Sequence, residues 1–245
     1  MKPIPTIAIE TAPLLAFGAH PDDIEFGCGA VIACETKAGR PCHMIVCSRG
    51  EAASHGTPEQ RTNEAQEASA VLGAQLEFMD LDGDAHLEVK LAHTLKLALK
   101  IRELKPAIVL VPSLVENQHP DHFRLGQLVR DAARLARYGG VRELKELPSH
   151  AIHHLFFYAV TSEAEPRDIS PVLIDVSPHE ILEIWKKSME AHASQTTARN
   201  YVELQMTRAR LHGARAGIGH AIPLFPNDPL VLENLGQLTR GARFF

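Results

Sequence analysis

The sequence has few of the features that mark secreted, membrane-spanning or nucleic-acid-binding proteins. It contains four cysteines in 245 residues and no CxxC pair, which argues against a zinc knuckle and favours reduced thiols in the cytoplasm. No run of Lys or Arg occurs and the formal net charge is -5, so the basic surface of a nucleic-acid binder is not expected. The early apolar stretch from Ala12 to Ala19 is too short for a membrane span or a signal peptide.

The composition is that of a folded globular protein. Hydrophobic residues make up 45% of the chain and charged residues 22%, which is enough apolar material for a sizeable core. The length fits one α/β unit with additions, so a single domain over residues 1–245 is expected. A small, uncharged substrate is compatible with this charge balance, and so is a homo-oligomer.

Strand-like and helix-like segments alternate along the first part of the chain. Leu14 to Phe17 is an apolar run that ends at Gly18, and a helix is expected from Phe26 to Ala38. The sequence Thr57-Pro58-Glu59-Gln60 is typical of a capped helix start, and Gly73 is a typical helix end. Further strands are expected at 42–47, 76–79, 107–111, 153–160 and 172–176, and further helices at 89–104, 121–138, 178–193 and 201–214.

This alternation predicts an α/β fold, a Rossmann-like sandwich with a mostly parallel central sheet and helices on both faces. Such sheets bind ligands beyond the carboxyl ends of their strands, so the active site is expected there. The last part of the chain, with Pro223, Pro226 and Pro229, is expected to be an irregular tail.

Two short polar clusters follow predicted strands. In the first, His20, Asp22 and Asp23 come directly after a buried strand, and a tight turn could aim His20 and Asp23 at one zinc ion. In the second, His119 and His122 open a helix after the strand at 107–111. Each cluster alone could be a helix cap or a polar turn, but together they supply two imidazoles and a carboxylate, the ligands of a catalytic zinc site with an open position for water.

The two motifs, AHPDDIEFGCG and HPDH, resemble the signatures of the LmbE-like or PIG-L family of metal-dependent N-deacetylases. The resemblance continues through Ser48-Arg49-Gly50-Glu51, His55-Gly56-Thr57, Arg61 with Glu64, and the later stretch His192, Ser194 and Gln195, so it spans most of the chain. It implies a hydrolase that removes an N-acetyl group from an N-acetylglucosamine-type substrate.

The resemblance also assigns roles to individual residues. It implies that His20, Asp23 and His122 bind the metal, with zinc expected and Fe²⁺ or another divalent ion as alternatives. It implies that Asp22 is the general base and that His119 stabilises the oxyanion or protonates the leaving amine. Two roles remain possible for Asp121: it could orient one of the histidine rings, or it could cap the helix.

Three further residues are candidates for substrate binding. Arg61 matches a family arginine that contacts substrate hydroxyls, although a solvated helix charge paired with Glu64 is the simpler reading of the residue itself. Asp84 falls where the family often has a substrate-contacting aspartate, and Asp82 is the alternative position. His192 is expected near the site. The remaining histidines, including His93 and His212, are expected at the surface or within strands.

One departure from the family concerns the end of the chain. The family commonly shows Tyr-Ala-Glu there, whereas this chain has His220-Ala221-Ile222 followed by Pro223. If residues 216–230 cover the sheet edge, they would present an apolar wall and favour an apolar anomeric substituent on the substrate.

Other functions remain open at this stage. The same metal chemistry would serve an amidase acting on a thiol or sugar conjugate. A metal-dependent phosphoesterase is a second alternative, although such sites usually hold two metals. A carbohydrate-binding protein without activity is a third, and the presence of Asp22 argues against it because such a protein could lose the base and keep its fold.

Overall fold

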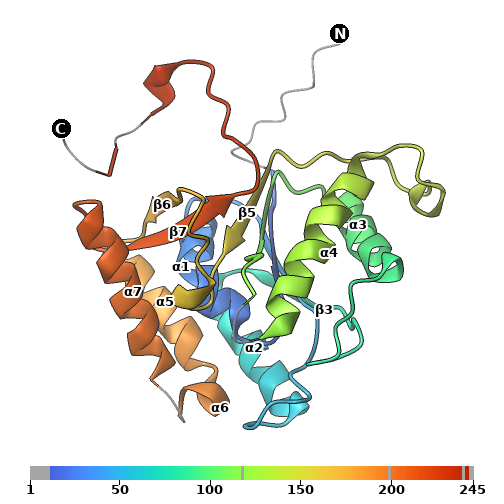
Figure 1. Cartoon of the computed structure of the whole chain (residues 1–245). Helices are drawn as coiled ribbons and strands as arrows, with labels where there is room; N and C mark the ends of the chain where they lie inside the picture. The colour runs from blue at the N-terminus through green and yellow to red at the C-terminus, as the bar shows by residue number, and fades with distance from the viewer. Residues whose placement is uncertain (1–11, 117–118, 198–199, 239–240, 243–245) are drawn as a thin grey trace.

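The computed structural model describes residues 12–116, 119–197, 200–238 and 241–242. The centre is a sheet of seven strands in the order β3-β2-β1-β4-β5-β7-β6 (Figure 1). The strands are β1 Leu14–Gly18, β2 Cys42–Val46, β3 Gln75–Phe78, β4 Ile108–Pro112, β5 His154–Tyr158, β6 Val172–Asp175 and β7 Ala221–Pro226. Strands β1 to β5 are parallel, and β7 runs antiparallel to β5 and β6. The predicted α/β fold with a mostly parallel sheet is confirmed.

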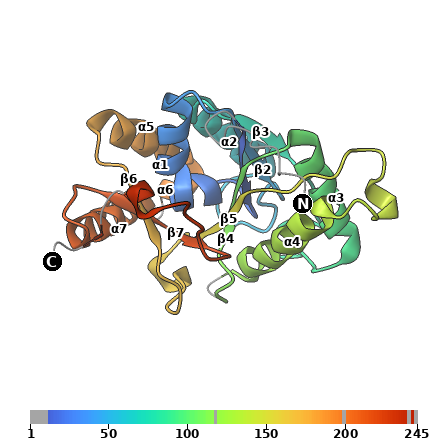
Figure 2. The ribbon, with the colours of Figure 1, turned by 90° about the horizontal axis from the view of Figure 1, so that it is seen from above.

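Helices cover both faces of the sheet (Figure 2). One face carries α1 Asp23–Lys37, α2 Pro58–Leu72, α5 His179–Glu190, α6 Ala193–Thr196 and α7 Tyr201–Arg215, and the other carries α3 Leu91–Leu104 and α4 Pro120–Arg137. Short 3-10 turns lie at Arg142–Leu144, Ser162–Ala164 and Leu235–Gln237. The apolar core is accordingly split into two clusters, one on each side of the sheet. None of the helices in the described part of the chain combines the length and apolarity needed to cross a bilayer.

Helix α2 begins and ends where its sequence predicts. The Thr57 side chain accepts a hydrogen bond from the backbone N–H of Gln60 at 3.1 Å, and Pro58 occupies the first turn. Gly73 ends the helix in the left-handed conformation, with φ of 71°. The two caps therefore fix the ends of the helix that carries Arg61.

The predicted irregular tail is wrong, because residues 221–226 form strand β7 inside the sheet. Ile222 is 3% exposed and packs in the core with α1 and α5, and Leu224 and Phe225 are also buried. Burial of these side chains outweighs the backbone N–H groups that Pro223 and Pro226 cannot supply to the sheet. Ile222 is therefore a core residue, and the expectation that it faces the substrate is wrong.

Two smaller expectations are also corrected. The helix predicted at 178–193 ends at Glu190, and α6 starts after a break at residues 191–192. His93 and His212, expected at the surface, are buried. Each of them lies within an ion-pair distance of a carboxylate, His93 of Asp82 and His212 of Glu165. All four cysteines lie in described segments and are free thiols there.

Candidate metal centre and active site

Three loops bring the polar clusters to one edge of the sheet. β1 and β4 are neighbouring parallel strands, so the loop after β1, which carries His20, and the loop before α4, which carries His119, leave the same edge. The loop after β3 adds Asp84. The ring centroids of His20 and His119 lie 4.2 Å apart, and those of His20 and His122 lie 5.3 Å apart.

Asp23 is held rigidly at the centre of this cluster. Its Oδ2 accepts backbone hydrogen bonds from Ala19 at 2.8 Å and from His20 at 2.9 Å, while its Oδ1 lies 2.9 Å from Nε2 of His122. Burial by itself would raise the pKa of Asp23, but the imidazoles of His122 and His20 hold it well below its usual range. The carboxylate is therefore ionised and oriented before any ligand arrives.

His20 lies among three carboxylates. Its Nδ1 is 3.5 Å from Asp23 Oδ2, and its Nε2 is 3.1 Å from Asp84 Oδ1 and 3.5 Å from Asp121 Oδ2. Burial would lower the pKa of His20, yet Asp23 and its neighbours raise it well above the ordinary value. The surroundings of this ring thus favour positive charge, as a cation site requires.

The donors fit a divalent metal. His20, Asp23 and His122 each offer one atom, and these atoms lie within 4.8 Å of one another in a buried cluster. A second set, formed by His20, Asp84, His119 and Asp121, meets the same criterion. In that set, however, Nδ1 of His119 accepts the backbone N–H of Asp121 at 3.3 Å, so its Nε2 carries the proton in the neutral ring and has no lone pair for a metal. The first set is therefore the better site.

Asp22 differs from its neighbours in backbone and environment. Its φ of 114° lies in the left-handed range that side chains other than glycine rarely adopt, which is common at functional sites. Its Oδ2 lies 3.2 Å from Nη2 of Arg61. Burial, opposed by Arg61 and reinforced by Asp23, raises the pKa of Asp22 to about 6.

Arg61 is buried, 4% exposed, and is not a solvated helix charge. Its Nη2 donates to the Pro21 carbonyl oxygen at 2.7 Å and to Asp22. The guanidinium also lies against Gly50, whose φ is 72° and where an added Cβ would lie 2.0 Å from Nη1 of Arg61. Gly50 belongs to the family-like stretch Ser48-Arg49-Gly50-Glu51 of the sequence. The structure shows why a glycine stands there, because any side chain would collide with Arg61.

His192 lies at the break between α5 and α6 and is 0% exposed. Its Nε2 is 3.3 Å from Glu25 Oε1, and this carboxylate raises the pKa of His192 although burial opposes the shift. Nearby, Glu64 accepts hydrogen bonds from the backbone N–H and the hydroxyl of Ser194 at 2.9 and 2.6 Å. The stretch 192–195 is therefore held against α1 and α2, the helices that carry Glu25 and Glu64. Sequence reasoning did not find the partners Glu25 and Glu64, which lie far from 192–195 in the chain.

Asp121 joins two of the loops. Its Oδ2 accepts the backbone N–H of Ala85 at 2.8 Å, and its Oδ1 lies 3.3 Å from Nη1 of Arg124. Burial would raise the pKa of Asp121, but His20 and His119 lower it. The buried carboxylate therefore ties the loop after β3 to the start of α4.

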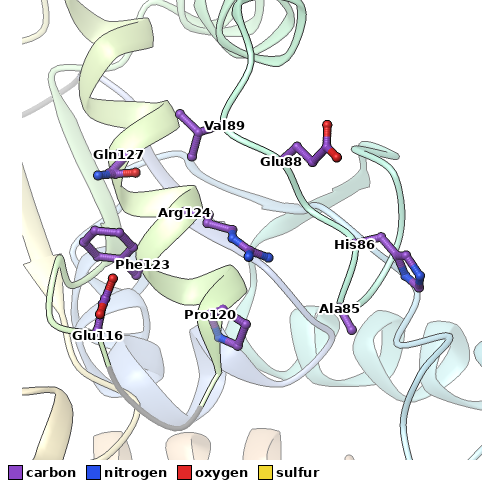
Figure 3. A pocket seen from close by; sticks show the side chains of 9 residues that line it. All are labelled: Ala85, His86, Glu88, Val89, Glu116, Pro120, Phe123, Arg124 and Gln127. Carbon is purple, nitrogen blue, oxygen red and sulfur yellow. The ribbon is translucent and has the colours of Figure 1, made fainter.

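An open recess of about 750 Å³ lies beside this junction, between residues 85–89 and the first turns of α4 (Figure 3). It is lined by Ala85, His86, Glu88, Val89, Glu116, Pro120, Phe123, Arg124 and Gln127. The lining combines an aromatic ring with carboxylates, a guanidinium and an amide. Groups of these kinds can contact both the apolar and the hydroxylated parts of a ligand.

The fold and this cluster define an α/β enzyme with a His/Asp centre suited to metal-assisted chemistry with water. Comparison with known proteins agrees with that class. Residues 15–133 match the family described as GlcNAc-PI de-N-acetylase. A conserved protein from Thermus thermophilus, whose structure is known, shares 31% sequence identity with the chain, with a TM-score of 0.80 over 92% of this chain and 99% of that one. The chain belongs to the PIG-L (LmbE-like) family.

Other relatives differ in their described activities. A 4-oxalmesaconate hydratase of Pseudomonas putida is 27% identical over 52% of this chain and 54% of its own length. An uncharacterized deacetylase of Escherichia coli, YaiS, is 36% identical over 31% of this chain and 42% of its own. The chain thus matches about half the length of these two relatives.

Two further solved structures share the fold at lower sequence identity. One is the 4-carboxy-2-hydroxymuconate hydratase of Pseudomonas putida, with a TM-score of 0.78, 22% identity and coverage of 92% of this chain and 100% of that one. The other is the N,N'-diacetylchitobiose deacetylase of Pyrococcus horikoshii, with a TM-score of 0.75, 18% identity and coverage of 87% and 83%. At these identities the likeness shows the fold alone.

Proposed function

We propose that the chain is a zinc-dependent hydrolase that removes the N-acetyl group from an N-acetylglucosamine-type substrate. The observation that carries this proposal is the convergence of His20, Asp23 and His122 in one buried cluster, with His119 beside it and Asp22 next in sequence to Asp23. The de-N-acetylase description of the family and the deacetylase description of YaiS support this choice of reaction.

His20, Asp23 and His122 would hold the metal. Two imidazoles and one carboxylate suit zinc and also Fe²⁺, and three protein ligands leave a position open. When bound, the ion lowers the pKa of a water molecule to about 7 and polarises the amide carbonyl. Two backbone hydrogen bonds to Oδ2 of Asp23 fix its carboxylate and the loop that carries His20, and its Oδ1 faces Nε2 of His122.

The remaining residues handle protons and charge. Asp22 would accept the proton of the attacking water on its carboxylate, and Arg61 holds that carboxylate in place. His119, whose Nδ1 accepts the Asp121 backbone N–H, presents Nε2–H to the developing oxyanion or to the leaving nitrogen. The backbone of Asp121 thus fixes the ring orientation that this step needs.

The recess at residues 85–89 would take the part of the substrate beyond the acetylated sugar. It lies next to Asp121 and Ala85, and its size suits a ligand group of one or two rings. Phe123 would face the apolar side of a ring, and Glu88 and Arg124 would meet its hydroxyls (Figure 3).

The proposal is tested by incubating the zinc-loaded protein with a series of N-acetylglucosaminides that differ only at the anomeric substituent and measuring released acetate. Acetate release that depends on metal and disappears in Asp22→Asn supports it. A metal-loaded protein that releases no acetate from any member of the series would contradict it and favour a binding protein without activity.

Hydration of a carbon–carbon double bond is a second candidate, because a relative over half of the chain is a hydratase. Such a reaction also needs an activated water and a proton donor, so the same residues would serve. The acetate assay separates the two reactions when it is run beside an assay for water addition to unsaturated carboxylic acids. The recess carries Glu88 and Glu116 against one Arg124, which favours neutral substrates over polyanionic ones.

A further inference from the structure

Asp84 lies in a tight turn after β3 and is 5% exposed. The turn has positive φ at Asp82, Gly83 and Ala85. The backbone N–H of Asp84 donates to Glu51 Oε2 at 3.0 Å, and its Oδ2 accepts the backbone N–H of Ala52 at 3.3 Å. One carboxylate oxygen is therefore anchored on the loop after β2, and the other, Oδ1, is directed away from that anchor.

Oδ1 of Asp84 lies between two imidazoles. It is 3.1 Å from Nε2 of His20 and 3.5 Å from Nε2 of His119. Among the described residues, this oxygen and His20 Nε2 are buried atoms with no hydrogen-bond partner of standard geometry.

We infer that Asp84 is a positioning residue that orients a metal ligand and the neighbouring proton donor at the same time. Nδ1 of His20 lies on the side of Asp23, and Nε2 lies on the side of Asp84. When His20 binds the metal through Nδ1, its ring proton is on Nε2 and faces Asp84. His119 has its Nδ1 lone pair occupied by the Asp121 N–H, so its proton also sits on Nε2, on the side of Asp84. One buried carboxylate oxygen thus lies within reach of both N–H groups.

This arrangement has a consequence for each ring. Carboxylates behind a metal-bound histidine fix its tautomer and increase its basicity, and their loss typically weakens metal affinity or activity by about 10- to 100-fold. The longer contact to His119 leaves that N–H free to turn to a substrate oxygen. With 5% of its surface exposed, Asp84 offers little area for direct substrate contact. The inference rests on the proposed metal-dependent function.

Asp82 offers a matched control in the same turn. Its carboxylate lies 2.6 Å from Lys90 Nζ and 3.3 Å from His93 Nε2, and neither partner belongs to the metal centre. Asp82→Ala therefore removes a carboxylate of the same turn without touching His20 or His119. Thermal unfolding of both variants shows whether the turn itself has been lost.

The decisive experiment measures the zinc dissociation constant by competition with a chelator, without substrate. Asp84→Ala should raise it about 10- to 100-fold, Asp84→Asn should fall between because its amide oxygen still accepts a hydrogen bond, and Asp82→Ala should leave it unchanged. An unchanged zinc constant in Asp84→Ala, with a raised KM for acetate release, would overturn the inference and make Asp84 a substrate contact. Zinc binding is measured without turnover, so it tests the role of Asp84 alone. The deacetylase proposal fails separately, if the unmodified chain releases no acetate.

Discussion

Asp22 combines a strained backbone with a contact that fixes its side chain. Its φ of 114° costs on the order of 1 to 3 kcal/mol, a cost that folded proteins retain where the surroundings enforce the conformation. Here the enforcing contacts are the Asp23 hydrogen bonds to Ala19 and His20 on one side and Arg61 on the other. The conformation lets consecutive carboxylates serve different tasks, with Asp23 facing His122 and Asp22 facing Arg61.

His119→Ala should retain bound zinc and lower kcat by about 10²- to 10³-fold with little change in KM, since the proposed hydrogen bond strengthens only in the transition state. Steady-state kinetics with an N-acetylglucosaminide and metal analysis check this. His119→Asn is the control for helix capping, because its side chain can still accept the Asp121 N–H. If KM rises while kcat is preserved, His119 positions substrate and is not the proton donor.

At the scale of single elements, the recess between the loop after β3 and α4 predicts a substrate effect. Phe123→Ala should raise KM for glucosaminides with a ring at the anomeric position by about tenfold, since a loss of roughly 1.4 kcal/mol of apolar contact has that effect. KM for N-acetylglucosamine itself should not change. Leu211→Ala, on the exposed face of α7, is the control. Equal effects on both substrates would mean that the recess does not bind the substituent.

Helix α7 is tied to the loop after β5 by charged groups. Oε1 of Glu165 lies 2.6 Å from Nε of Arg208 and 2.9 Å from Nε2 of His212, and Arg208 also donates to the Ala159 carbonyl oxygen. Burial would raise the pKa of Glu165, but His212 and Arg208 lower it. A carboxyl group whose folded pKa is lowered stabilises the fold above its unfolded pKa, and this contribution is lost as pH falls through the folded value.

Glu165→Gln should therefore lower the free energy of unfolding by about 1 to 3 kcal/mol at pH 7, because Arg208 loses its charged partner. The difference from the unmodified chain should shrink as pH falls below about 4, because the Glu165 carboxylate of the unmodified chain is then protonated and its charge is lost. Urea unfolding at several pH values measures this. A difference that stays constant down to pH 3 would show that packing, and not the charge, carries the effect.

For the whole molecule, the sequence predicted the parallel part of the sheet and the meeting of the two polar clusters. Local patterns were sufficient there, because the apolar run from Leu14 to Phe17 predicts a strand and the capped start of α2 predicts a helix. The two clusters meet because the carboxyl ends of parallel strands lie at one edge of the sheet. Strand β7 was missed because Pro223 and Pro226 argue against a strand, and only the tertiary burial of Ile222 reverses that argument. Burial of Arg61 and His192 likewise depends on Gly50 and Glu25, partners that a linear pattern does not reveal.

The proposed mechanism gives adjacent residues different tasks: His20 and Asp23 would hold the metal, and Asp22 would accept the proton. Zinc content and acetate release of His20→Ala, Asp23→Ala and Asp22→Asn, measured together on purified protein, test it most directly. His20→Ala and Asp23→Ala should lose zinc, whereas Asp22→Asn should keep about one zinc per chain and lose kcat by orders of magnitude. If Asp22→Asn lost zinc as completely as His20→Ala, or kept both zinc and full activity, the division would be contradicted.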